Sequence, residues 1–449
     1  MSRFQQQLDF CSFSPSDILT RLEHLTGLVY LQDHHVPVIA FLPQTFLLSK
    51  QTGLHQFQQV AFNQYQSTIK PTCLLDFMNF QTDLETPCNP TGFDGGYIGF
   101  FSYDYGAAQS IQLNMHPQPN FYLGQYHSFL KYQDGVWVFH SDDQDAAMLY
   151  RYLCTCLQHP ATIPTLSLLT PCAPRWSKQQ YLNAFQQVQD YIRAGDCYQI
   201  NLTQEFTAPA QGALLSRAKD LWQLTHAPYA GYLKIDDFEL ISCSPELFID
   251  FQTKRKIKTR PIKGTMPRFA DAQQDQQSKE RLMQSEKDRA ENVMIVDLLR
   301  NDLSLYAETG SVTTTKLFEI ESFNQVHHMV SEITATLKDD IHPMQMLLSA
   351  LPGGSITGAP KIRAMQIIEE LEQQPRGAYC GSLGYFNFDG TGCWNILIRS
   401  IQKYQNQLSM WAGGGITIAS DAEAEYQECF DKISAMLNLI NTPQHSNQA

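Results

Sequence analysis

The sequence lacks the features that mark several large classes of protein. Its formal net charge is −13 over 449 residues, so no basic surplus is present to bind nucleic acid or an anionic membrane. No apolar run is long enough to span a bilayer, and no basic segment with an apolar stretch follows Met1. The 11 cysteines are scattered and form no CxxC pair, because Cys154 and Cys156 are too close together for that spacing. We therefore expect a cytoplasmic protein with reduced thiols and with neither nucleic acid nor a membrane as partner.

Familiar nucleotide and zinc motifs are incomplete. The glycine-rich stretch 353–358 has the spacing of a P-loop, but Ala359 stands at its lysine position and Lys361 comes two residues late. Residues 413–415 begin like a dinucleotide fingerprint, yet Ile418 occupies the place of its final glycine. No HExxH sequence occurs. These gaps argue against the common ATP-binding, NAD-binding and zinc-protease classes.

Length and composition predict a large core and one to three domains, because 43% of the residues are hydrophobic and only 17% are charged. Prolines and small polar residues at 159–176 read as a linker. It would separate a β-rich N-terminal subdomain (1–158) from a longer catalytic region (177–442), followed by a disordered tail at 443–449.

The longer C-terminal region carries the clearer secondary-structure signals. A helix is expected between a cap at Ser177 and a stop at Gly195, and a strand over 198–206. Further expected elements are strands near Tyr232, Leu240, Leu247 and Ile257, a helix over 278–299, a helix beside Pro360, a meander of strands at 378–387, 393–402 and 407–413, and a last helix capped by Ser420 and Glu423. Strands joined by short turns with long helices between them predict an α+β fold with antiparallel sheets and helices outside.

Acidic residues at helical spacing suggest a site for a hard cation. Glu425, Glu428 and Lys432 share one face of the last expected helix. A solvated Glu428–Lys432 ion pair explains that face equally well. Glu291 borders an apolar run on the 278–299 helix, where it would serve as a capped salt bridge or as a second ligand. Mg²⁺ takes one or two carboxylates together with substrate oxygens, so Glu291 and Glu428 would suffice.

Two glycine-rich stretches offer backbone amides to an anion. Residues 352–361 lead into a helix and 413–415 follow a strand. Arg399, placed at the end of the expected strand 395–399, supplies a fork for a carboxylate. Tyr379 and His328 are candidate hydrogen-bond donors, or equally core residues.

Lys263 stands between an apolar residue and a glycine, two residues after Pro261. An amine in such a place can lose hydration and act as a nucleophile, whereas the alternative is a solvated lysine at the end of a basic hairpin. Four basic residues of the preceding segment fall on even positions: Lys254, Lys256, Lys258 and Arg260. If the strand stays regular, Lys263 points away from that basic face.

Taken together these segments resemble the chorismate-utilising enzymes. The resemblance covers residues 170–440 most strongly and rests on five segments that occur in the family's order: 244–248 (SPELF), 287–292 (KDRAEN), 297–302 (DLLRND), 354–361 (GSITGAPK) and 425–428 (EYQE). The stretch 93–104 resembles the N-terminal part of the amine-forming members. The resemblance implies an α+β fold like that of anthranilate synthase component I, with two large antiparallel sheets packed as a sandwich.

The resemblance also implies roles for named residues. Glu291 and Glu428 would hold Mg²⁺, with Glu425 close by, and Glu246 would act as general acid/base near the departing hydroxyl. The remaining residues would contact chorismate: Arg399, Tyr379 and the amides of Gly414 and Gly415 at the enolpyruvyl carboxylate, Ser355 and His328 near the ring, and Lys432.

Within the family, two positions favour the aminodeoxychorismate synthases. The sequence PIKGT around Lys263 is similar to theirs, whereas the anthranilate and isochorismate synthases carry alanine there. In the family mechanism this lysine adds to the ring as the C4 hydroxyl leaves, and ammonia then displaces it. Gln199 stands where the water-adding members have a lysine, which disfavours water as the incoming nucleophile.

Two departures from the family pattern bear on regulation and on the ammonia supply. The tryptophan-sensing LLES motif is absent, and 30–33 (YLQD) takes its place. No glutamine amidotransferase domain is recognisable, so ammonia would come from solution or from a separate glutaminase subunit. The resemblance thus implies a transferase of 4-aminobenzoate and folate synthesis. Anthranilate synthase component I and a non-catalytic binding regulator remain the alternatives.

Overall fold

Two large antiparallel sheets organise the chain. The computed structural model describes residues 3–33, 36–50, 52–69, 74–80, 92–114, 117–322 and 326–443. Every pairing between its named strands is antiparallel, as the short turns between strands require. The α+β class expected from the sequence is confirmed.

The first sheet has 13 strands within the described residues. In spatial order they are β1 (Phe4–Gln7), β10 (Val136–Ser141), β9 (Ser128–Gln133), β3 (Val36–Ala40), β2 (Val29–Asp33), β14 (Tyr229–Ile235), β15 (Phe238–Ser244), β24 (Ser400–Tyr404), β25 (Gln407–Ile416), β13 (Gln199–Gln211) and β11 (Ser167–Leu168), with β12 (Ala173–Pro174) and β21 (Gly358–Ala359) also paired to β13.

The second sheet has 12 strands within the same described residues. Their order is β18 (Ile262–Pro267), β20 (Val326–Thr336), β17 (Lys256–Arg260), β16 (Leu247–Phe251), β23 (Gly392–Asn395), β22 (Ser382–Asn387), β7 (Gly96–Phe101), β8 (Phe121–Tyr126), β4 (Thr45–Lys50), β5 (Gly53–Ala61) and β6 (Gln64–Ile69), with β19 (Thr313–Ser322) paired to β20.

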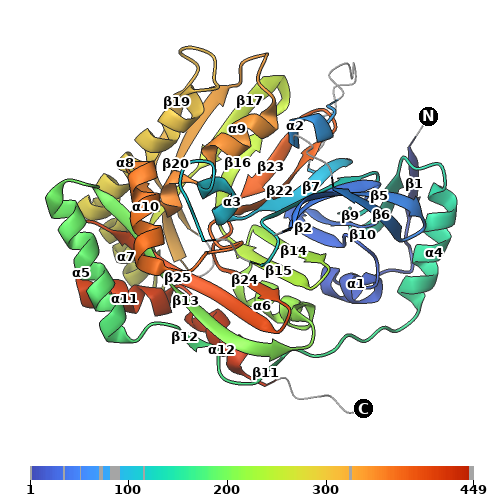
Figure 1. Ribbon diagram of the computed structural model, residues 1–449, viewed down its shortest axis with the longest axis horizontal. Helices are drawn as coiled ribbons and strands as arrows, with labels where there is room; N and C mark the ends of the chain where they lie inside the picture. Colours follow the sequence, from blue (N-terminus) through green and yellow to red (C-terminus); the bar gives the residue numbers. More distant parts are fainter. Residues whose placement is uncertain are drawn as a thin grey trace.

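The helices lie outside this pair of sheets (Figure 1). They are α1 (Pro15–Leu22), α2 (Leu74–Phe77), α3 (Tyr103–Ala107), α4 (Ala146–Gln158), α5 (Lys178–Ala194), α6 (Ala218–Thr225), α7 (Ala272–Gln284), α8 (Glu286–Ser304), α9 (Pro343–Ala350), α10 (Lys361–Glu372), α11 (Ala422–Asp431) and α12 (Ser434–Asn441), with 3₁₀ turns η1 (Leu214–Arg217), η2 (Thr253–Arg255) and η3 (Gly354–Ile356). No helix in the described ranges is long and apolar enough to cross a membrane.

Aromatic side chains from both sheets meet in the interior between them. Phe100 of β7 stacks on Phe238 of β15 with ring centroids 5.1 Å apart, and both side chains are buried. Each sheet takes strands from both sides of the expected linker 159–176. Of the tail expected at 443–449, all but the first residue lies outside the described residues.

Several elements form as their local sequence dictates. The helix expected after Ser177 is α5, where Ser177 and Gln180 make a capping box and Gly195 closes the helix in a left-handed conformation. The expected strand at 198–206 is β13, which continues to Gln211. The strands expected near 232, 240, 247 and 257 are β14 to β17.

The helix expected over 278–299 is wrong, because the structure has two helices there. Ser285 has an extended conformation that ends α7, and its hydroxyl accepts from the Asp288 amide and so caps α8. A serine side chain competes with helical backbone bonds in this way. The break places Lys287 and Glu291 on the first turns of a fresh helix.

The meander expected between 378 and 413 is also wrong. β22 and β23 belong to the second sheet, whereas β24 and β25 belong to the first. The chain crosses between the sheets at 396–399, so Arg399 lies in the crossover and not at the end of a strand. Its φ of 50° is left-handed, which no regular strand allows.

The last expected helix begins differently from the prediction and is divided in two. Asp421, and not Ser420, caps α11, and a break at Ile433 separates α11 from α12. The Ser420 hydroxyl instead donates to Glu425 Oε1 at 2.6 Å. The expected face of Glu425, Glu428 and Lys432 survives, because all three precede the break.

Candidate active site

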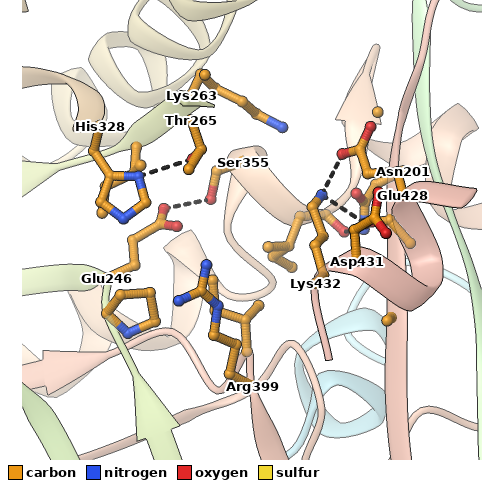
Figure 2. A pocket seen from close by; sticks show the side chains of 18 of the residues that line it. Asn201, Glu246, Lys263, Thr265, His328, Ser355, Arg399, Glu428, Asp431 and Lys432 are labelled. Carbon is orange, nitrogen blue, oxygen red and sulfur yellow. Dashed lines mark hydrogen bonds and ion pairs between the residues drawn. The ribbon is translucent and has the colours of Figure 1, made fainter. Parts of the chain in front are cut away.

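A cavity of about 750 Å³ opens beside the ends of both sheets, against α8 and α11 (Figure 2). Its walls come from β13, from the segment after β15, from β18, β20 and β25, and from η3. All but one of the residues expected at the site line it: Glu246, Lys263, Glu291, His328, Ser355, Tyr379, Arg399, Gly415, Glu425, Glu428 and Lys432. The fold therefore brings together residues that are far apart in sequence.

The exception is Gly414, which lies behind the acidic residues. A Cβ at this glycine would meet Glu425 Oε2 at 2.8 Å and Glu428 Oε1 at 3.0 Å. The glycine thus leaves room for the two carboxylates. The Gly414 amide was expected at the substrate, whereas its α-carbon lies against Glu425 and Glu428.

Glu246 lies on one side of the cavity and is 4% exposed. Burial raises the pKa of this carboxyl to about 7, although the Ser355 hydrogen bond and the Lys263 charge act to lower it. Ser355 Oγ donates to Glu246 Oε1 at 2.9 Å. A carboxyl with such a pKa can both give and take a proton near neutral pH.

Lys263 extends its side chain into the cavity from β18 (Figure 2). Its charge acts on the pKa of Glu246, Glu291 and Glu428, so the amine lies between the acid/base and the acidic cluster. The next residue, Gly264, has a φ of +85°, and a Cβ there would lie 3.0 Å from Asp288 Cβ. Glycine is therefore required where β18 bends past α8.

An acidic cluster occupies the opposite wall. It consists of Glu291 on α8 and of Glu425 and Glu428 on α11. Burial raises the pKa of Glu291. Burial acts in the same direction on Glu428, but the charges of Lys432 and Lys287 outweigh it and lower the pKa. Lys432 Nζ lies 2.6 Å from Glu428 Oε1 and donates to the Gly413 carbonyl at 2.8 Å. The Glu428–Lys432 ion pair offered as the simpler interpretation is thus present, at the edge of the cavity.

The acidic cluster suits a cation because it is negatively charged and because some of its oxygens lack hydrogen bonds. Glu291 Oε1 and Glu425 Oε2 are buried and have no hydrogen-bond partner within the described residues. Buried carboxylate oxygens without a hydrogen bond are costly, and a cation would satisfy them. No three His, Cys, Asp or Glu side chains of the described ranges are grouped closely enough to hold a metal by themselves. Mg²⁺ needs only one or two carboxylates when the substrate supplies further oxygens.

The remaining walls can bind an anion. Burial lowers the pKa of Arg399, and an arginine remains charged at any pH near neutral. Burial and the charge of Arg399 lower the pKa of His328 to about 4, so the imidazole is neutral. His328 Nδ1 and Thr265 Oγ1 are 2.8 Å apart. Tyr379 stacks on Trp411 with centroids 6.1 Å apart, which fixes the orientation of its ring.

Gln199 stands beside Gly415 and is 1% exposed. A Cβ at Gly415 would lie 2.1 Å from Gln199 Nε2, so the amide packs directly against this glycine. Gln199 Oε1 has no hydrogen-bond partner within the described residues. A neutral amide therefore backs the cavity wall at the place where the water-adding enzymes were expected to carry a lysine.

Sequence reasoning missed Lys287, Thr265 and Asn201, which also line the cavity. Lys287 had a signal, because it precedes Glu291 by four residues on one helix. Thr265 and Asn201 had none, since a threonine and an asparagine in strands are ordinary residues.

Comparison with known proteins identifies the family of this chain. Residues 43–438 match the family described as chorismate binding enzyme. The chain is 43% identical over 378 residues to aminodeoxychorismate synthase component 1 of Salmonella typhimurium, covering 80% of this chain and 81% of the relative. It is 41% identical over 362 residues to the protein of the same name from Klebsiella aerogenes, covering 78% of each.

Solved structures agree with the fold. Anthranilate synthase component I from Streptococcus pneumoniae superposes with a TM-score of 0.75 at 27% identity, covering 90% of this chain and 92% of the other. The isochorismate synthase MenF of Escherichia coli, at 18% identity and a TM-score of 0.73, shares the fold and covers 98% of this chain and 94% of its own. The two-sheet sandwich expected from the resemblance is confirmed, and the chain belongs to the chorismate binding enzyme family.

Proposed function

We propose that this chain aminates chorismate at C4 and releases 4-amino-4-deoxychorismate, as component I of an aminodeoxychorismate synthase. The observation that carries the proposal is Lys263, whose amine enters a cavity that also holds Glu246 and the acidic cluster. The relatives of the same name, at 41–43% identity, support it. The product would serve 4-aminobenzoate and folate synthesis.

The cavity suits chorismate, which is a dianion. Arg399 provides a bidentate donor for the enolpyruvyl carboxylate, with Tyr379 and the Gly415 amide beside it. Glu291 and Glu428, with Glu425 adjacent, would hold Mg²⁺ against the ring carboxylate. When bound, that ion would supply positive charge to offset the carboxylate.

Lys263 and Glu246 would perform the chemistry. In its neutral form the Lys263 amine adds to the ring and forms a C–N bond, while the C4–O bond breaks. The leaving hydroxyl takes the proton of Glu246 and departs as water. Ammonia then forms the C4–N bond, the lysine leaves the ring with its electron pair, and the ionised Glu246 accepts the proton that the new amine loses. Each step leaves the ring at the same oxidation level.

A separate glutaminase subunit would supply ammonia. The name component 1 of the relatives is consistent with a two-subunit enzyme. We propose a cytoplasmic location, in keeping with the scattered cysteines, which are free thiols wherever the structure describes them.

The test is turnover of chorismate by the purified chain with Mg²⁺ and ammonium salt. The proposal expects 4-amino-4-deoxychorismate, detected by mass spectrometry, without release of pyruvate. Direct formation of anthranilate and pyruvate would instead identify an anthranilate synthase. Binding of chorismate without any product would point to the non-catalytic regulator.

A further inference from the structure

A buried ion pair lies behind the cavity, outside its lining. The side chains of Arg376 and Glu372 are each 1% exposed. Arg376 Nε donates to Glu372 Oε2 at 2.9 Å and its Nη2 donates to Glu372 Oε1 at 2.7 Å. This bidentate geometry fixes the plane of the guanidinium. Glu372 is held in turn by the amide and hydroxyl of Thr203, at 2.9 and 2.7 Å.

The guanidinium also binds two carbonyls of the cavity wall. Its Nη1 donates to the Ile356 carbonyl at 3.0 Å, and its Nη2 donates to the Asn201 carbonyl at 2.7 Å. Asn201 Nδ2 donates to the same Ile356 carbonyl at 3.1 Å. The single turn η3 is thus held to β13 by this buried cation in addition to the direct bond from Asn201.

This hydrogen-bond network extends to Glu246, the proposed acid/base, through Ser355. Ser355 precedes Ile356 in η3 and is 7% exposed, and its hydroxyl makes the 2.9 Å bond to Glu246. A turn of three residues has little regular bonding of its own to hold it. The contacts at the Ile356 carbonyl therefore help to set its position, together with the bond from the Asn201 backbone amide to the Thr357 carbonyl at 2.8 Å.

We infer that Arg376 is a positioning residue for the reaction: it holds η3 so that Ser355 can fix Glu246 against the substrate. The inference deepens the proposed function and rests on it, since chorismate turnover is one of its measurements. The competing explanation is that Arg376 only fills and neutralises the core around Glu372.

The variants that test the role of Arg376 leave unchanged the charged groups that face Glu246. They are Lys263 of β18, Lys432 at the end of α11 and Arg399 of the crossover, and the neutral His328 of β20 lies alongside (Figure 2). Arg376→Lys keeps the total charge as well. A change in the titration of Glu246 in that variant would thus arise from geometry and not from a lost charge.

The experiment compares Arg376→Lys, Ser355→Ala and the double variant with the wild type. A lysine cannot reach both carbonyls and Glu372 at once. We expect kcat to fall about 10- to 100-fold in each single variant, because a displaced general acid is felt in the transition state. KM for chorismate should change less than about threefold.

The double variant distinguishes positioning from core filling. If Arg376 acts through Ser355, the double variant should have nearly the kcat of Ser355→Ala alone. Multiplied losses in kcat would overturn the inference. Arg175→Lys is the matched control, since Arg175 Nη2 also binds Glu372, at its carbonyl, but touches neither cavity carbonyl. That variant should keep the wild-type kcat.

A second measurement is independent of turnover. Titration of the Glu246 carboxyl by NMR of ¹³C-glutamate protein, assigned with Glu246→Gln, should show a higher pKa in Arg376→Lys, because the Ser355 bond lowers it. An unchanged titration would overturn the inference even if the wild type turned out to lack the proposed activity. Where Arg376→Lys fails to fold, Glu372→Asp replaces it with the same expected direction, because it keeps the charge of the pair while its shorter side chain cannot hold the guanidinium in the same place.

Discussion

Lys287 Nζ lies 3.4 Å from Glu425 Oε1, and the two residues differ sharply in exposure. The lysine side chain is 49% exposed, whereas that of Glu425 is 3% exposed. Burial acts to lower the pKa of Lys287, but Glu425 and Glu291 outweigh it and raise the pKa. The lysine therefore reaches in from the surface and partly neutralises the acidic cluster.

Removing this lysine should strengthen metal binding. In Lys287→Met the acidic cluster loses a competing charge, and we expect Mg²⁺ to bind about two- to fivefold more tightly, the range for a half-exposed ion pair. Titration calorimetry without chorismate measures it. The control is Lys178→Met, because Lys178 pairs with Glu423 of α11 outside the cavity. Weaker binding in Lys287→Met would contradict the prediction.

The lysine in the cavity should be indispensable for amination and dispensable for binding. In Lys263→Ala we expect turnover to fall at least about 10³-fold, because a covalent step has no substitute. Chorismate affinity, measured by fluorescence titration, should change little. Lys256→Ala is the matched control, since Lys256 is exposed at the start of β17. Near-normal turnover in Lys263→Ala would refute the covalent role.

The raised pKa of Glu246 predicts a pH dependence. The protonated form is the acid, so kcat should decline as the pH rises through about 7. Glu246→Gln keeps an acceptor for Ser355 but cannot donate the proton, and should lower kcat about 10²- to 10⁴-fold. The pH values 6 and 8 bracket the Glu246 pKa of about 7. A wild-type kcat that stays constant between them would exclude Glu246 as the limiting acid.

The Glu246 carboxyl also makes the free energy of unfolding depend on pH. Its folded pKa lies above the unfolded value of 4.5, so its stabilising contribution is present below that value and is lost as the pH rises through about 7. The free energy of unfolding of Glu246→Gln minus that of the wild type should therefore increase from pH 5 to pH 8, values on either side of that window. Urea unfolding at three pH values measures this difference, and a decrease would contradict the assignment.

A methyl group at Gly414 should disturb the acidic cluster and spare the fold. The Cβ of Gly414→Ala would press on Glu425 Oε2 and Glu428 Oε1, which are the ends of side chains and can move. We expect weaker Mg²⁺ binding and lower turnover, with thermal unfolding within a few degrees of the wild type. Unchanged metal affinity would show that these two carboxylates do not bind the ion.

Local signals predicted many elements correctly because they depend on neighbours in sequence. The cap at Ser177 and the stop at Gly195 define α5 through bonds made within a few residues. The alternation of buried and half-exposed residues in β17 also follows the expected parity, with Ile257 and Thr259 buried. Lys258 and Arg260 are not simply solvated, since each pairs with an acidic residue.

The errors had one local and one long-range cause. The cap that Ser285 provides to Asp288 divides α7 from α8, and this local signal was overlooked. The crossover at Arg399 exists because β23 and β24 pair with strands of different sheets. These partners are not visible from the residues nearby, so a continuous strand was the simpler expectation.

By itself the sequence determined the family of this protein. Five segments in the family's order, from 244–248 to 425–428, were sufficient to indicate it and to predict which residues the site would contain, because side-chain chemistry and local spacing are fixed along the chain. Tertiary structure alone decided how these groups act on one another. It raised the pKa of Glu246 by burial, brought Lys287 against Glu425 and set Arg376 behind Ser355, since burial and contact depend on what the folded chain places nearby.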